Sequence, residues 1–160
     1  MYPNIDKDDW EELVEFSINY ADTITERTEI EGLYILESDS DYGSIEEEQQ
    51  ATKLINFIKI LEIKYGPHPI ILDAKSNFEN AIALQIKYKE QAIELCAAED
   101  FMLRGSIKKS LAEVLFENTT GSTKPLQLIE EAIEDLRIDG FGSDLLDAIE
   151  IKFRYKNAVG

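Results

Sequence analysis

The sequence predicts an all-α protein, folded as an irregular stack of about six or seven helices paired into antiparallel hairpins. Three observations lead to this fold class. Apolar residues recur at three- and four-residue spacing through most of the chain. No stretch of any length alternates apolar and polar residues as a strand does. Only 4 Pro and 8 Gly interrupt 160 residues that are 44% hydrophobic, so we expect one domain over residues 1–160 with a sizeable core.

The first third of the chain predicts one helix and one ambiguous segment. Residues 6–27 carry an apolar stripe at helical spacing, with Trp10 as a core anchor. Residues 29–36 fit a second helix, a continuation of the first, or a short strand over Leu33–Leu36. Helix is favoured, because no partner strand is visible elsewhere.

A long central helix is predicted after the loop of residues 37–43. Ser44 and Glu47 have the spacing of a capping box, which starts the helix. It runs to Tyr65 with apolar residues on two flanks, so we expect neighbours on both sides. The first flank holds Ala51, Leu54, Ile55, Ile58, Leu61 and Tyr65, and the second holds Phe57, Ile60 and Ile63.

The second half of the chain predicts further helices separated by turn residues. Pro69 begins a helix that bends or continues near residues 76–80, and another runs to about Ala98. Helices over residues 101–117 and 123–138 form a hairpin, with Thr123 as the cap of the second. Ser143 caps a last helix, for which we expect an inward face made of Leu145, Leu146, Ala148, Ile149 and Phe153.

The hairpin of residues 106–136 carries a family resemblance. Leu111, Ala112 and Leu115, followed by Ile129 and Ala132, resemble the large and small consensus positions of a tetratricopeptide repeat. Pro125 stands where that family usually has a small Ala. The match covers about 30 residues, roughly the length of one repeat. The resemblance implies a stack of helical hairpins that binds peptides or domains.

Negative charge is concentrated in the first third of the chain. Residues 1–50 hold 16 Asp and Glu against two basic residues, a net charge of −14, whereas residues 51–160 hold 17 acids and 14 bases, or −3. This field disfavours nucleic acid as a partner and favours a basic protein. The plain alternative is a charged face that only keeps the protein soluble. No apolar run is long enough for a membrane span and no signal peptide is recognisable, so we expect a cytoplasmic protein.

Few residues in the sequence suggest catalysis. His68 is the only histidine and lies between two prolines, where a loop residue with a structural or incidental role is expected. Cys96 is the only cysteine, so no internal disulfide is possible, and it is expected to be a buried small hydrophobe. Neither residue has the neighbours of a nucleophile or the partners of a zinc site. We therefore expect no enzyme, no metal and no cofactor.

A calcium loop of the EF-hand type is the one metal site considered. Glu37, Asp39, Asp41 and Glu48 fall at positions 1, 3, 5 and 12 of such a loop. Tyr42 stands at position 6, where the loop requires Gly, and Gly43 comes one residue late. Weak, adventitious cation binding is the more plausible outcome.

Three functions follow from these features. The first is a non-catalytic protein-binding module, because in size, charge and layout the chain loosely resembles small acidic immunity proteins of bacterial toxin–immunity systems. That resemblance implies inhibition of a basic effector, such as a nuclease, through Glu37, Asp39, Asp41, Glu46 and Glu47. The second is a scaffold or self-associating structural protein, which apolar exposure on Leu33–Leu36 or on the last helix would favour. The third is a metal-dependent enzyme that uses Asp39, Asp41 and Glu48.

Overall fold

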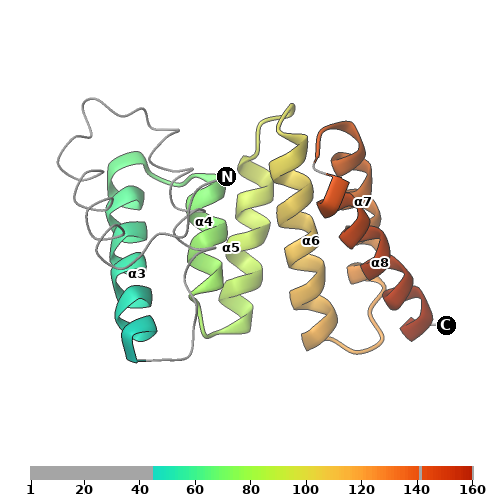
Figure 1. Cartoon of the computed structure of the whole chain (residues 1–160), viewed down its shortest axis with the longest axis horizontal. Helices are drawn as coiled ribbons and strands as arrows, with labels where there is room; N and C mark the ends of the chain where they lie inside the picture. The colour runs from blue at the N-terminus through green and yellow to red at the C-terminus, as the bar shows by residue number, and fades with distance from the viewer. Residues whose placement is uncertain (1–44, 141, 160) are drawn as a thin grey trace. The chain divides into compact units, whose positions relative to one another are not determined.

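A computed structural model describes residues 45–140 and 142–159, coloured from blue-green to red in Figure 1. Within these residues the chain forms helices and no strand, which confirms the predicted all-α fold. The helices are α3 (Ile45–Tyr65), α4 (Pro69–Asn77), α5 (Ile82–Leu95), α6 (Phe101–Asn118), α7 (Lys124–Ile138) and α8 (Gly142–Val159). The elements expected over residues 6–27 and 29–36, and the proposed cap Ser44, lie outside the described residues.

The chain divides into two compact units, residues 1–78 and 79–160, and each is described by itself. The single domain stays a prediction. The described part of the first unit is the α3–α4 pair. Gly66, with φ of 74°, adopts the left-handed conformation that ends α3. His68 then caps α4, because its Nδ1 accepts a hydrogen bond of 3.1 Å from the backbone N–H of Ile70.

Helix α3 buries one stripe and leaves another face open. Its buried side chains recur at helical spacing, and they are Leu54, Phe57, Ile58 and Leu61. The expectation of a second covered flank is wrong for Ile60 and Ile63, which are 40% and 86% exposed. The cause is geometric: at 100° per residue, Ile63 lies about half a turn around the helix from the buried stripe. An ion pair of 3.0 Å between Lys75 and Glu62 joins α4 to α3.

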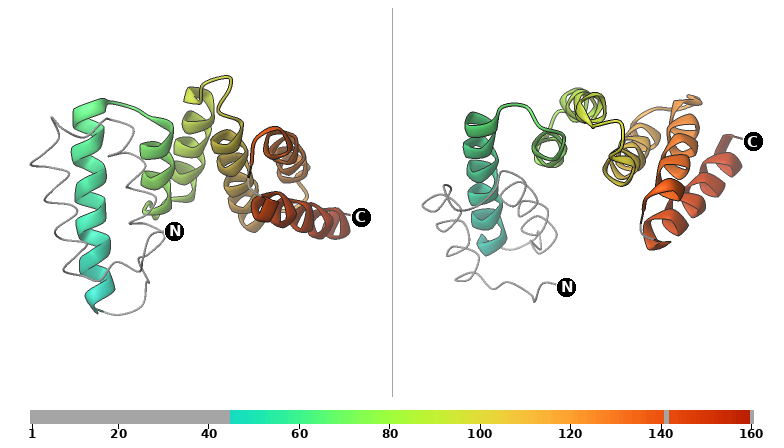
Figure 2. Two further views of the ribbon diagram at one scale, coloured as in Figure 1. Left: turned by 45° about the horizontal axis from the view of Figure 1, so that its top comes forward. Right: turned by 90° about the horizontal axis from the view of Figure 1, so that it is seen from above.

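The second unit stacks α5, α6, α7 and α8 in chain order (Figures 1 and 2). Each helix packs on the next, α6 and α7 form the most extensive pair, and α8 also contacts α6. The five positions that resemble the repeat consensus are all buried. Ala112, Ile129, Ala132 and Leu136 join Ala148, Ile151 and Tyr155 of α8 in one apolar core. The hairpin thus provides the packing centre of this unit.

Gly105 allows the close approach of α6 to α7. A Cβ atom at this position would lie 2.9 Å from Cγ of Leu136 and 3.1 Å from both the carbonyl oxygen of Ala132 and Cβ of Asp135. The first distance is shorter than real Cβ contacts, so a side chain here would push the two helices apart. Gly105 is buried although glycine weakens a helix interior, and close packing explains its presence.

Two helix ends differ from the sequence expectations. Thr123 makes no capping hydrogen bond through its side chain; instead Oγ of Ser122 accepts a bond of 3.2 Å from the backbone N–H of Lys124. Helix α5 ends at Leu95, before the expected Ala98, and Cys96 occupies its C-cap. The Cys96 thiol is half-buried and donates to the carbonyl of Ala92 at 3.3 Å. Cys96 is therefore a capping residue at a helix end, not a fully buried apolar one.

Candidate functional site

The acidic residues expected to bind a partner fall mostly outside the described structure. Glu37, Asp39 and Asp41 lie outside the described residues, while Glu46 and Glu47 belong to the first turn of α3. No group of three or more His, Cys, Asp or Glu side chains in the described ranges is arranged to hold a metal ion. Among the same residues, no helix combines the length and the apolar character of a membrane span.

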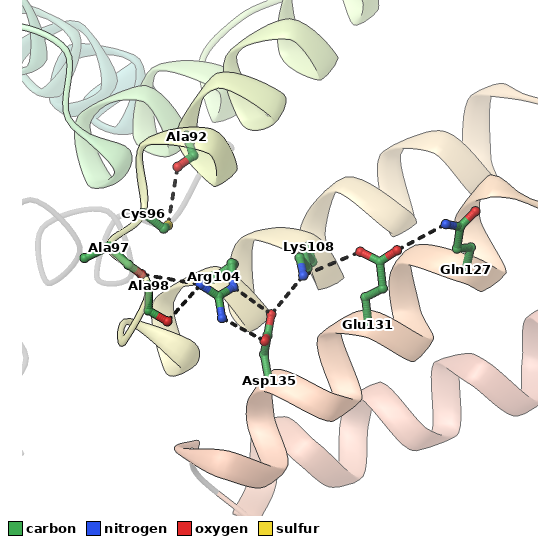
Figure 3. A network of polar contacts seen from close by, with 9 residues as sticks. All are labelled: Ala92, Cys96, Ala97, Ala98, Arg104, Lys108, Gln127, Glu131 and Asp135. Carbon is green, nitrogen blue, oxygen red and sulfur yellow. Dashed lines mark hydrogen bonds and ion pairs between the residues drawn. The ribbon is translucent and has the colours of Figure 1, made fainter.

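A polar network links α6 to α7 and extends to the end of α5 (Figure 3). Arg104 donates two hydrogen bonds of 3.1 Å to the two carboxylate oxygens of Asp135, a bidentate pair. Lys108 adds an ion pair of 3.0 Å to Asp135 and a longer one of 3.5 Å to Glu131. Gln127 completes the row by donating to Glu131 at 3.2 Å.

Arg104 also anchors the segment between α5 and α6. Its guanidinium donates to the carbonyl oxygens of Ala97 and Ala98 at 3.4 and 3.2 Å. The same group lies 5.0 Å from the centre of the Phe101 ring, within cation–π distance. One side chain of α6 thus connects α7 with the segment that precedes α6.

The pKa shifts in this network show that its charged groups stabilise one another. Burial of Asp135 would raise its pKa, but hydrogen bonds from Arg104 and Lys108 outweigh burial and hold the pKa below its ordinary value. The hydrogen bond to Asp135 in turn raises the pKa of Arg104. Both groups therefore stay charged at neutral pH and satisfy one another. The network holds helices together and offers no reactive group.

A groove of 450 Å³ runs between α7 and α8. Its apolar lining is Ile133 together with Ile149 and Phe153. Its rim carries both signs of charge, with Glu130, Glu134 and Arg137 on α7 and Lys152 and Lys156 on α8. Lys152 pairs with Glu130 at 3.2 Å. Glu134, Arg137 and Lys156 have no ion-pair partner among the described residues, so their charges are available to a ligand.

Helix α8 carries two apolar stripes, and only one of them is buried. The buried stripe contains Ala148, Ile151 and Tyr155, and the Tyr155 ring stacks on Phe116 of α6 with centroids 4.0 Å apart. The inward face expected from the sequence is therefore wrong for Leu146 and Phe153, which are 65% and 62% exposed. The two stripes have the same helical spacing, so periodicity alone could not tell which one faces α6 and α7.

The second stripe, in which Leu146 and Phe153 are exposed and Ile149 is half-buried, continues the apolar lining of the groove onto the outer face of α8. Ile149 and Phe153 belong to both, and Leu146 extends the apolar surface one turn further toward the start of the helix. Monomeric proteins rarely leave several large apolar side chains exposed together unless the surface contacts something. We call Leu146, Ile149 and Phe153 the α8 stripe, and this stripe with its groove is the candidate site.

Comparisons with known proteins do not assign this chain to a family. No protein-family model matches it, and neither a curated protein nor a solved structure does.

Proposed function

We propose that this chain is a non-catalytic protein-binding module, and that the α8 stripe and the adjoining groove form its docking surface. The observation that carries the proposal is the exposure of Leu146 and Phe153, 65% and 62%, on the last helix. Burying such side chains against a partner stabilises a complex by roughly 1.5–3 kcal/mol each. The charged rim, with Glu134 and Arg137, would orient the partner.

A second candidate, an immunity-type inhibitor, is favoured by the charge segregation of the sequence. The net charge of −14 over residues 1–50 would attract a basic effector and speed its binding. In this proposal Glu37, Asp39, Asp41, Glu46 and Glu47 contact the effector, and the stack of hairpins is a tetratricopeptide-like scaffold that presents them. A metal-dependent enzyme that uses Asp39, Asp41 and Glu48 is the third, unsupported alternative.

Site-specific photo-crosslinking in living cells tests the docking surface. A benzophenone amino acid replaces Phe153 in one variant and Gln127 in another, because Gln127 is exposed on α7 but does not line the groove. We expect discrete adducts with another protein chain from position 153 and none from position 127. Adducts from neither position, or equal adducts from both, would contradict this docking surface.

Salt dependence tests the immunity-type candidate once a partner has been captured. For a basic partner held by the acidic third, affinity should fall steeply as salt rises. Replacing Glu37, Asp39 and Asp41 by Lys should weaken binding and flatten that dependence. Salt-independent binding of an acidic partner would exclude the electrostatic mechanism while leaving the docking surface intact.

A further inference from the structure

The exposed face of α8 has the spacing of a helix–helix seam. Gly142, Leu146, Ile149, Phe153 and Lys156 follow one another at intervals of four, three, four and three residues. This is the heptad spacing with which one helix packs along another. The seam lies beside the buried stripe. Ile149 is half-buried and also packs on the core, whereas Leu146 and Phe153 are exposed, so α8 can keep its place in the fold and pair with a further helix.

We propose that the partner of this seam is α8 of a second copy, paired antiparallel about a two-fold axis that passes between Asp147 and Ala148. The proposal rests on the proposed docking surface and names its occupant. In this register Leu146 faces the partner's Ile149, and Ile149 faces the partner's Leu146. Phe153 then faces the partner's Gly142. A two-fold interface repeats each of these contacts.

Gly142 provides the space that Phe153 requires. A Cβ atom on Gly142 would meet nothing within 4 Å, so packing within the chain does not require glycine at this position. Phe153 is the largest side chain of the seam and is 62% exposed. A large side chain opposite a missing one lets two helices approach closely, as in other tightly packed helix pairs. The seam is therefore complementary to itself in shape.

Charge favours the antiparallel orientation. A parallel arrangement would place Lys156 beside the partner's Lys156, and the two ammonium groups would repel, whereas the antiparallel arrangement keeps them far apart. The seam spans about 21 Å, at 1.5 Å per residue, so the interface is short and a dissociation constant in the micromolar range is expected.

Sedimentation equilibrium of the full chain tests the proposal, at protein concentrations from roughly 1 µM to 1 mM, the range in which weak dimers dissociate. We expect a reversible monomer–dimer equilibrium that Leu146→Ser with Phe153→Ser weakens at least about tenfold. Gly142→Leu should weaken it similarly, because the new side chain fills the space for Phe153. Ile138→Ser is the matched control, since Ile138 is an exposed apolar residue outside the seam, 63% exposed. Circular dichroism checks that each variant keeps its helices.

A size exchange tests the register. Gly142→Leu and Phe153→Ala should each weaken the dimer severalfold, and the double variant, in which large and small side chains still face one another, should restore much of the affinity. A wild-type chain that stays monomeric at the highest concentration would overturn the second copy as occupant. Crosslinked adducts of position 153 with a different protein would then leave the proposed function standing. A dimer unaffected by the seam variants, or a double size variant without recovery, would overturn the antiparallel pairing.

Discussion

Replacing Gly105 by Ala should destabilise the α6–α7 hairpin, although Ala is the better helix former. In an open helix this substitution stabilises by about 1 kcal/mol. Here the new Cβ would lie 2.9 Å from Cγ of Leu136 and 3.1 Å from the carbonyl oxygen of Ala132. Leu136 is buried, and the carbonyl of Ala132 belongs to the helix backbone and cannot rotate away. The two helices must therefore separate. Overpacking of this kind costs about 1–3 kcal/mol.

The two effects together predict a net loss of about 1 kcal/mol of unfolding free energy for Gly105→Ala, and a larger loss for Gly105→Val. Native-state hydrogen exchange of the α6 and α7 amides measures this loss in the unit concerned. Ser106→Ala is the control, because Ser106 is exposed on the same helix and should gain a few tenths of a kcal/mol. If Gly105→Ala slowed exchange as much as an unhindered substitution would, the close approach of α6 and α7 would be refuted.

Three further predictions concern single side chains. Because folding lowers the pKa of Asp135, its carboxylate stabilises the folded state above its ordinary pKa, and this stabilisation is lost as the pH falls. Asp135→Asn should therefore cost about 2–3 kcal/mol of unfolding free energy at neutral pH. In urea unfolding, the variant should also lose less stability than the wild type when the pH is lowered. Burial, with a smaller effect from Glu113, raises the pKa of Tyr155 to about 12, so its phenol should ionise late in an absorbance titration. The free energy of unfolding should fall as the pH rises from the ordinary pKa of tyrosine toward 12, because the unfolded chain loses this proton first. His68→Ala should cost about 1 kcal/mol by thermal unfolding and His68→Asn should recover most of it; equal losses in both would contradict the capping role.

The sequence predicted those parts of the fold that depend on local periodicity and turn residues. The bounds of α6 and α7 agree with the expected helices to within about one residue, within the usual ±1–2 uncertainty of helix ends. Pro69 and the turn before it marked the start of α4. His68 was expected to have a structural or an incidental role, and the structure decides for the first, because its imidazole caps that helix. Each of these signals lies within a few residues of the element that it determines.

Features that depend on contacts between distant residues were not predictable in this way. The network of Arg104, Lys108 and Asp135 joins positions 31 residues apart, and nothing in the local sequence distinguishes Asp135 from neighbouring acids. The role of Gly105 was not predicted, because it is set by Leu136 of the facing helix. A conspicuous sign was its place inside an otherwise strong helix, where glycine needs a packing reason.

The candidate site was missed for a related reason. Helix α8 is apolar at Leu146, Ile149 and Phe153 and also at Ala148, Ile151 and Tyr155. Leu146 and Phe153 were expected in the core, whereas the structure places the core on the other stripe. Two apolar stripes on a terminal helix are themselves a signal, since one neighbouring hairpin covers only one of them.

Hydrogen exchange of the full chain at low and high concentration tests most directly whether α8 meets another protein chain. Mass spectrometry compares peptides from α8 with peptides from α5, which lies outside the proposed seam. We predict that amides between Gly142 and Lys156 exchange more slowly at high concentration, and that the Leu146→Ser with Phe153→Ser variant loses this protection. Exchange in α8 that does not depend on concentration, or protection confined to other helices, would contradict the assignment of the α8 stripe as the surface of self-association.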